Sequence, residues 1–191
     1  LDRLLCEMRA RGNERIVIVS NFTQTLDQIG ILCKERFFPA VRLDGSMAVK
    51  KRRVLVEDFN DPEKHQFAFL LSSKAGGCGL NLIGANRLIL FDPDWNPATD
   101  KPAAARVWRD GQKRRCYVYR FLTAGTIEEK VFQRQLSKEG LQSIVVDDKM
   151  TVNAQSGDEL RDIFHLEATC SSTHSSLKCK RCVDGYCDEK E

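Results

Sequence analysis

Short apolar runs that alternate with stretches of helical character constrain the fold of this chain most. In Ile16-Val-Ile-Val19 and Leu88-Ile-Leu-Phe91, apolar residues follow one another without the alternation of a half-exposed strand. Such runs are typical of strands covered on both faces, as in a parallel sheet. Strands that alternate with helices favour right-handed crossovers. The sequence therefore predicts a doubly wound α/β domain.

The same pattern gives the expected elements. We expect strands at residues 15–20, 40–43, 67–72, 87–91 and 116–122. We expect helices at residues 1–11, 23–36, 49–59, 103–109 and 126–135, with Asn21 or Thr23 as the cap of the second helix. Ligands of open α/β sheets bind at the loops that leave the carboxyl ends of the strands, so candidate site residues should lie there.

Length and charge set broad limits on the function. The length of 191 residues fits one domain with an appendage. The formal net charge of only +3 does not by itself indicate a nucleic-acid partner. Three basic clusters are either nucleic-acid contacts or solubilising surface: Lys50-Lys-Arg-Arg53, Lys113-Arg-Arg115 and Lys178-Cys-Lys-Arg181. No apolar run approaches the roughly 20 residues that span a bilayer, so we expect no membrane partner. Because the chain starts inside an expected helix, we also expect it to be part of a longer protein.

The cysteines are distributed unevenly. Four of the eight lie in the last 22 residues. The spacing His174-x4-Cys179-x2-Cys182-x4-Cys187 offers four ligands for tetrahedral zinc, and Cys170 is an alternative to Cys187. A reduced tail without metal is the other interpretation. Either interpretation favours a reduced, intracellular protein over a disulfide framework. We expect three regions: residues 1–146 as the main domain, 147–170 as linker and short helix, and 171–191 as the zinc-binding tail.

A glycine-rich block follows one expected strand. In Ser72-Ser-Lys-Ala-Gly-Gly-Cys-Gly79, a strand leads into a turn that brings backbone N–H groups close to an anion. The block is not a Walker A loop, since Leu80 and Asn81 follow its last glycine instead of lysine and Ser or Thr. A tight turn without a ligand is the alternative interpretation.

A pair of arginines follows farther along the chain. Arg106 and Arg109 stand three residues apart, on one face of the expected helix, and Gly111 and Gln112 follow them. Two guanidinium groups in this arrangement are suited to neutralise a phosphate that another domain holds, as arginine fingers do. The alternative is a solvated basic helix face.

These blocks resemble the second RecA-like lobe of Swi/Snf-type DNA translocases, in helicase superfamily 2, over roughly residues 15–146. The glycine-rich block resembles the fifth helicase motif and the arginine pair the sixth. Further blocks in matching order are Val19-Ser-Asn-Phe-Thr-Gln-Thr-Leu-Asp27, Arg42-Leu-Asp-Gly-Ser46 and Arg87-Leu-Ile-Leu-Phe-Asp-Pro-Asp-Trp-Asn-Pro97. Within the family, the residues of these motifs are most similar to those of the branch that acts in homologous recombination.

The resemblance implies a function for the chain. It would be the second motor lobe of a nuclear ATPase that translocates along double-stranded DNA in homologous recombination and double-strand-break repair. ATP and Mg²⁺ would be bound mainly by the first RecA-like lobe of the same protein, and further partners would be double-stranded DNA and a RecA-like strand-exchange recombinase. Since a Walker A loop is lacking, this chain alone should not hydrolyse ATP.

The resemblance also assigns roles to residues that match the family's motifs. The implied catalytic contacts with the γ-phosphate of ATP are Arg106 and Arg109. The implied nucleotide contacts are Gly77, Gly79, Asn81 and Gln112. The implied DNA-backbone contacts are Asn21, Gln24, Thr25, Arg42, Lys51, Ser72, Ser73 and Lys74. The branch also ends in a zinc-binding segment, and Ser172–Cys182 resembles its start, although the later cysteines of the branch are mostly missing here. The implied metal ligands are His174, Cys179, Cys182 and Cys187, with Cys170 as the alternative to Cys187.

One position departs from the family, and two other functions stay open. Pro102 stands where the family usually has glutamine, although proline suits the first turn of a helix. The first alternative is a chromatin-remodelling motor lobe of the same superfamily. The second is a non-catalytic DNA- or protein-binding module with a degenerate sixth motif, for which Pro102 is the only support.

Overall fold

The computed structural model describes residues 1–12, 14–75, 79–92, 94, 96, 102–132 and 135, and the backbone of 182–183 and 186–187. The chain divides into two compact units, Leu1–Phe121 and Leu122–Glu191. The first unit contains the predicted sheet. The predicted boundaries at residues 146 and 170 lie in the second unit and stay predictions.

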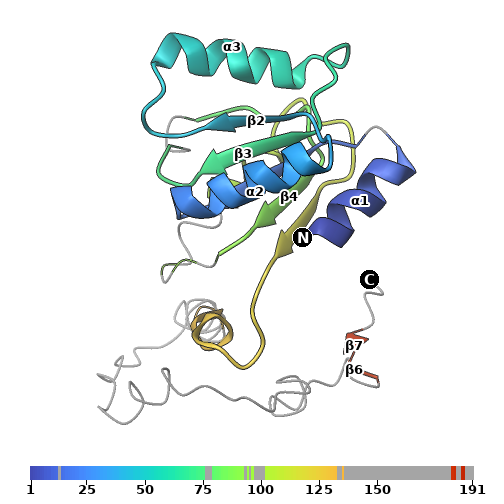
Figure 1. Ribbon diagram of the computed structural model, residues 1–191, viewed down its shortest axis with the longest axis vertical. Helices are drawn as coiled ribbons and strands as arrows, with labels where there is room; N and C mark the ends of the chain where they lie inside the picture. Colours follow the sequence, from blue (N-terminus) through green and yellow to red (C-terminus); the bar gives the residue numbers. More distant parts are fainter. Residues whose placement is uncertain are drawn as a thin grey trace, which may run out of the picture. The chain divides into compact units, whose positions relative to one another are not determined.

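A five-stranded parallel sheet forms the centre of the first unit (Figure 1). Its strands are β1 Ile16–Ser20, β2 Ala40–Leu43, β3 Ala68–Ser72, β4 Arg87–Leu90 and β5 Tyr117–Arg120. The strand order is β2-β3-β1-β4-β5, and every neighbouring pair is parallel. Strands β2 and β3 lie on one side of β1, and the later strands β4 and β5 lie on the other side. The predicted doubly wound α/β fold is therefore confirmed.

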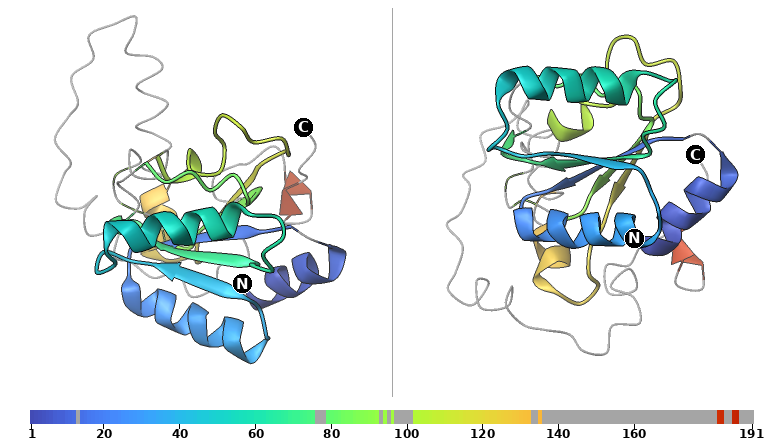
Figure 2. Two further views of the ribbon diagram at one scale, coloured as in Figure 1. Left: turned by 90° about the horizontal axis from the view of Figure 1, so that it is seen from above. Right: turned by 45° about the horizontal axis from the view of Figure 1, so that its top comes forward.

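Helices cover both faces of this sheet. Helices α1 (Asp2–Arg11) and α2 (Thr23–Glu35) lie on one face and α3 (Val49–Asn60) on the other (Figure 2). Since successive strand residues point to opposite faces, β1 contributes to two cores. Ile18 belongs to the core beneath α1 and α2, and Val17 belongs to the core beneath α3. This two-sided burial explains the continuous apolar runs in the sequence.

The expected strands match the observed ones to within two residues, but the expected helix at 103–109 is wrong. The regular helix covers only residues 102–104, and turns follow it. The amide groups of Arg106 and Val107 bond to carbonyl groups three residues back, at 3.1 and 3.2 Å. The carbonyl of Arg106 accepts the amide of Leu82 at 2.9 Å. This long-range bond ties the segment to the loop before β4.

The expected cap of α2 is also wrong. The N-cap residue is Phe22, and no side chain caps the helix. The Asn21 side chain instead accepts a hydrogen bond from the hydroxyl of Ser73 at 2.5 Å. The Asn21 side chain thus bonds the loop after β3 instead of capping α2.

The second unit is described only in part. Residues 127–132 and 135 are helical, and the amides of Thr123 and Gly125 donate to the carboxylates of Glu128 and Glu129 at 2.8 Å each. The expected helix at 126–135 is confirmed for these residues. Farther on, β6 (Cys182–Val183) pairs antiparallel with β7 (Tyr186–Cys187). Within the described part of the chain, every helix is too short or too polar to span a bilayer.

Candidate functional site

A polar network joins three loops at the carboxyl ends of β1, β3 and β4. The amide of Asn21 donates to both oxygens of the Asp92 carboxylate, at 3.0 and 2.9 Å, and the hydroxyl of Ser20 donates to it at 3.1 Å. The hydroxyl of Ser73 donates to the side-chain oxygen of Asn21 at 2.5 Å. Two predicted DNA contacts, Asn21 and Ser73, therefore belong to one hydrogen-bonded cluster.

The sequence pattern did not assign Asp92 or Ser20 to this cluster. Asp92 follows β4 by two residues, and Ser20 is the last residue of β1. Both positions belong to strand ends, where functional groups of α/β sheets gather. Their pairing depends on β1 and β4 being neighbours in the sheet, since these strands are separated by most of the domain in sequence.

The other predicted DNA contacts differ in exposure. Gln24 and Lys74 are exposed at the carboxyl edge, Lys51 is exposed on α3, and Thr25 is partly buried. Ser72 has only 4% of its surface exposed and closes β3. The structure therefore presents Gln24 from the first turn of α2, which follows β1, and Lys74 from the turn that follows β3.

Arg42 is held by two carboxylates. Its guanidinium group pairs with Asp27 and lies 3.3 Å from Asp44. The hydroxyl and amide of Ser46 donate to Asp44 at 2.5 and 3.1 Å. These bonds, the hydroxyl first, hold the pKa of the Asp44 carboxyl below its usual value. Asp44 therefore stays ionised and helps to orient Arg42.

The candidate arginine finger contacts the glycine-rich loop. Arg109 is exposed, and its Nη1 donates to the carbonyl of Gly79 at 2.9 Å. Gly79 has φ = +60°, a left-handed conformation that favours glycine. Arg106 lies in the same turn and is partly buried. The structure thus joins the predicted fifth and sixth motifs into one assembly, while Gly77 lies outside the described residues.

Gln112 connects this turn to the loop before β4. Its side-chain nitrogen donates to the carbonyl oxygens of Ala85 at 2.7 Å, Ile83 at 3.2 Å and Val107 at 3.3 Å. Its side-chain oxygen accepts the amide of Arg114 at 3.0 Å. The structure thereby gives Gln112 a bracing role in addition to the predicted nucleotide contact.

Asn81 lies beside the glycine-rich loop. Its backbone carbonyl accepts the side chain of Asn60 at 2.8 Å. Its side-chain Oδ1 is buried and has no hydrogen-bond partner within the described part of the chain. That oxygen remains able to accept a hydrogen bond from a donor that the described residues do not supply.

The predicted zinc ligands are described only in backbone, and only in part. Cys182 and Cys187 are cross-strand partners in the β6–β7 hairpin. His174, Cys179 and Cys170 lie outside the described residues. Among the side chains that the structure does describe, no three of His, Cys, Asp and Glu are grouped to hold a metal. The zinc site stays a prediction.

The chain is similar in sequence to a known protein family and to several known proteins. Residues 1–111 match the model of the helicase conserved C-terminal domain. The chain is 59% identical, over 98% of its length, to the DNA repair and recombination protein RAD54 of Oryza sativa subsp. japonica. It is 59% identical over 95% of its length to Protein CHROMATIN REMODELING 25 of Arabidopsis thaliana. It is 58% identical over 96% of its length to the DNA repair and recombination protein RAD54-like of Homo sapiens.

The chain spans only 20%, 21% and 25% of the lengths of these three relatives, respectively. Among solved structures, it resembles the C-terminal part of the Fun30 ATPase domain with a TM-score of 0.68 and 31% identity. That match covers 85% of this chain and 49% of the other. The sheet order, the strand-end loops and these matches agree with the resemblance found in the sequence. The chain therefore belongs to the helicase conserved C-terminal domain family, within which it forms a RecA-like second lobe of the Swi/Snf type.

Proposed function

We propose that this chain is the second motor lobe of an ATPase that translocates along double-stranded DNA in homologous recombination. The contact between Arg109 and Gly79 carries the proposal, because it joins the arginine turn to the glycine-rich loop at the ligand-binding edge of the sheet. Two relatives that share more than half of their aligned residues with this chain are named as DNA repair and recombination proteins.

Arg109 is the residue best placed to act on a nucleotide. Its guanidinium group is exposed and bonds a neutral carbonyl, that of Gly79. A bond from a guanidinium to a phosphate is charge-assisted and roughly twice as strong as a neutral one. A γ-phosphate of ATP, held with Mg²⁺ mainly by a first lobe, would therefore draw Arg109 away from the loop. Arg106, three residues earlier in the same turn segment, would add a second positive charge.

The glycine-rich loop would couple the movement of Arg109 toward the γ-phosphate to the DNA contacts. Gly79 lies five residues after Lys74, and Lys74 follows the residue that bonds Asn21. Movement of Arg109 away from Gly79 would release one end of the loop, while Ser73 holds the other end to β1. Lys74 and Gln24 would contact phosphates of the duplex, which position a protein without reading sequence.

A test of the DNA contacts uses a two-lobe protein that contains this chain. Lys74→Ala should raise the duplex concentration that gives half-maximal ATPase stimulation about tenfold and lower its salt dependence by about one counterion. The exposed Lys34 on α2 is the matched control, and Lys34→Ala should leave both quantities unchanged. Equal half-maximal duplex concentrations and equal salt dependence in the two variants would show that Lys74 does not contact DNA.

A second candidate function is a chromatin-remodelling motor lobe. The name of the Arabidopsis relative, which is 59% identical to this chain, favours it. The two functions differ in partner, so a pull-down with a RecA-like recombinase against histone octamer separates them. Preferential capture of recombinase supports the proposed function. The protein that contains this chain would then act in the nucleus. Preferential capture of octamer supports the alternative.

We also propose that His174, Cys179, Cys182 and Cys187 would hold a zinc ion. The cross-strand pairing of Cys182 with Cys187 is compatible with two thiolates that bind one metal. Zinc would stabilise the fold of the tail. The purified chain should contain one zinc per molecule by atomic absorption, and Cys182→Ser should lose it.

A further inference from the structure

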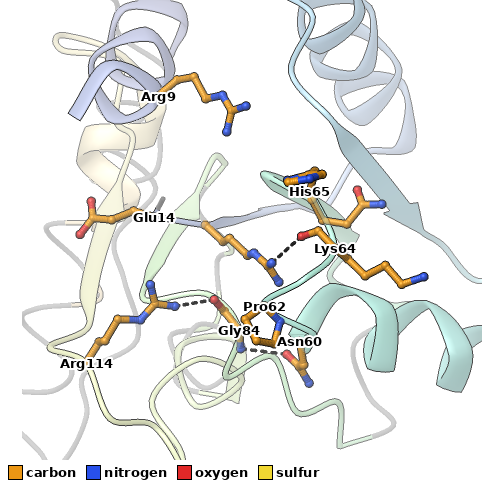
Figure 3. A pocket seen from close by; sticks show the side chains of 10 residues that line it. Arg9, Glu14, Asn60, Pro62, Lys64, His65, Gly84 and Arg114 are labelled. Atoms are coloured by element: carbon orange, nitrogen blue, oxygen red, sulfur yellow. Dashed lines mark hydrogen bonds between the residues drawn. The ribbon is translucent and has the colours of Figure 1, made fainter. Parts of the chain in front are cut away.

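A polar pocket of about 370 Å³ lies at the amino-terminal edge of the sheet (Figure 3). Glu14 and Arg15 line it just before β1, and Lys64 and His65 line it shortly before β3. Strand β1 is five residues long, so this edge is about 16 Å from the carboxyl edge. The pocket therefore lies at the opposite edge of the sheet from the Asn21–Ser73 cluster, and Gln112 lies beside it through its bond to the amide of Arg114.

The buried Arg15 carries a positive charge into this pocket. Only 8% of its surface is exposed, and its guanidinium group donates to the carbonyls of Phe59, Asp61 and Lys64, the last two at 2.7 and 2.6 Å. All three acceptors are neutral. These bonds use three N–H donors of the group, but no acceptor among them supplies a counter-charge, and a buried charge is costly without one.

A neighbouring charge of the same sign increases this cost. Burial, and then repulsion from Arg114, lower the pKa of Arg15, and the carboxylate of Asp61 offsets the effect only in part. Arg114 donates to the carbonyl of Gly84 at 2.6 Å, which fixes its guanidinium group at the wall of the pocket. Arg9 reaches the pocket from α1, with its guanidinium group 5.7 Å from the centre of the Phe67 ring.

The other charged groups of the pocket are already paired. Glu14 accepts Arg87 at 2.5 Å, and its carboxylate turns away from the pocket centre in Figure 3. Lys64 pairs with Asp58 at 3.8 Å. By contrast, within the described part of the chain none of Arg9, Arg15 and Arg114 has a carboxylate within 4.0 Å.

We propose that this pocket binds the phosphate or pyrophosphate group of a small molecule, held by Arg9, Arg15 and Arg114. Asp61 and Glu14 act on Arg15 and Arg114 only by longer-range attraction, without an ion pair within 4.0 Å. Three guanidinium groups from three separate segments, with so little compensation, match a ligand with more than one negative charge better than a single carboxylate. Planar guanidinium groups suit phosphate oxygens. The volume lies within the usual range for small-molecule sites, about 300–1,000 Å³.

Titration of the full chain with inorganic pyrophosphate, followed by calorimetry, tests the proposal. Arg9→Gln and Arg114→Gln should each weaken binding about tenfold, since each removes one charge-assisted contact. Arg3→Gln is the matched control on α1, because its side chain is 93% exposed, outside the pocket, and it loses the same charge. That control should bind like the wild type. Thermal unfolding of each variant verifies that the fold is intact, and glutamine keeps a donor for Gly84.

Further titrations identify the source of the phosphate group. Equal affinity for pyrophosphate and ADP supports recognition of the phosphates alone, whereas tighter binding of ADP that is lost in Arg9→Gln supports a nucleotide ligand. Absence of saturable binding by millimolar pyrophosphate, or equal binding by the wild type and the Arg9→Gln/Arg114→Gln double variant, would overturn the proposal. Displacement of pyrophosphate by a 20-bp duplex that needs the same arginines would also overturn it, by assigning the pocket to nucleic acid.

Discussion

At the scale of single residues, Gly84 shows how closely the loop before β4 packs against α3. A Cβ atom at this position would lie 2.7 Å from the carbonyl oxygen of Phe59 and 2.8 Å from the Cα of Asn60. Both are backbone atoms, so neither can move aside as a flexible side chain would. The close approach also lets Gly84 donate its amide to Asn60 at 2.8 Å.

Gly84→Ala should therefore lower the free energy of unfolding by about 1–3 kcal/mol, the usual cost of overpacking. Gly45→Ala is the control, since a Cβ there meets nothing within 4 Å, and its effect should stay within about 0.5 kcal/mol. Urea denaturation of the three proteins measures both values. Similar stability of Gly84→Ala and Gly45→Ala would contradict the packing described here.

Glu14 should make stability depend on pH. The hydrogen bond from Arg87 lowers the pKa of the Glu14 carboxyl, against the effect of burial. Because the folded pKa lies below the unfolded value of about 4.3, this stabilisation is complete above that pH and is lost as pH falls through the folded pKa. The stability difference between wild type and Glu14→Gln should shrink between pH 6 and pH 3 in denaturant titrations. A difference that stays constant across this range would exclude the linkage.

At the scale of elements, the sequence was sufficient where local pattern decides the structure. The five strands were predictable because two-sided burial makes their residues continuously apolar. The end of the helix after residue 104 was not, since it depends on the bond between Arg106 and the distant Leu82. The cap of α2 failed for a similar reason, because Asn21 bonds Ser73 across the sheet.

The same distinction applies to the candidate site. The positions of Asn21 and Ser73 at the carboxyl edge were predictable because each directly follows a strand, and their role as DNA contacts stays a prediction. The role of Asp92 required the knowledge that β4 lies beside β1. The cationic pocket was not predictable, since Arg9, Arg15 and Arg114 come from separate parts of the sequence and meet only in the folded chain.

Gln112 gives an element-scale prediction. Its amide bonds three carbonyl groups and holds the arginine turn against the loop before β4. Gln112→Ala leaves these acceptors without their donor, so it should lower the free energy of unfolding by about 1–3 kcal/mol. The exposed Gln28 on α2 is the control, and Gln28→Ala should change little. Chemical denaturation compares them, and an equal effect of the two changes would argue against the bracing role.

At the scale of the whole molecule, we propose that this lobe supplies half of a two-lobe motor. It presents Arg109 at the sheet edge but has no Walker A loop in its sequence. The 191-residue chain alone should therefore show no ATP hydrolysis above background, with or without duplex DNA, in a phosphate-release assay. DNA-stimulated turnover by this chain alone would contradict the division of labour between two lobes.

The most direct test of the central claim is DNA-stimulated ATP hydrolysis by a two-lobe protein that contains this chain, with wild type compared with Arg109→Ala. Arg3→Ala, on the exposed side of α1, is the control for loss of an arginine. If Arg109 acts on the γ-phosphate, turnover should fall by roughly 10³-fold or more while ATP binding is retained, and the control should remain active. Equal turnover in wild type and Arg109→Ala would contradict the assignment and favour a non-catalytic binding module.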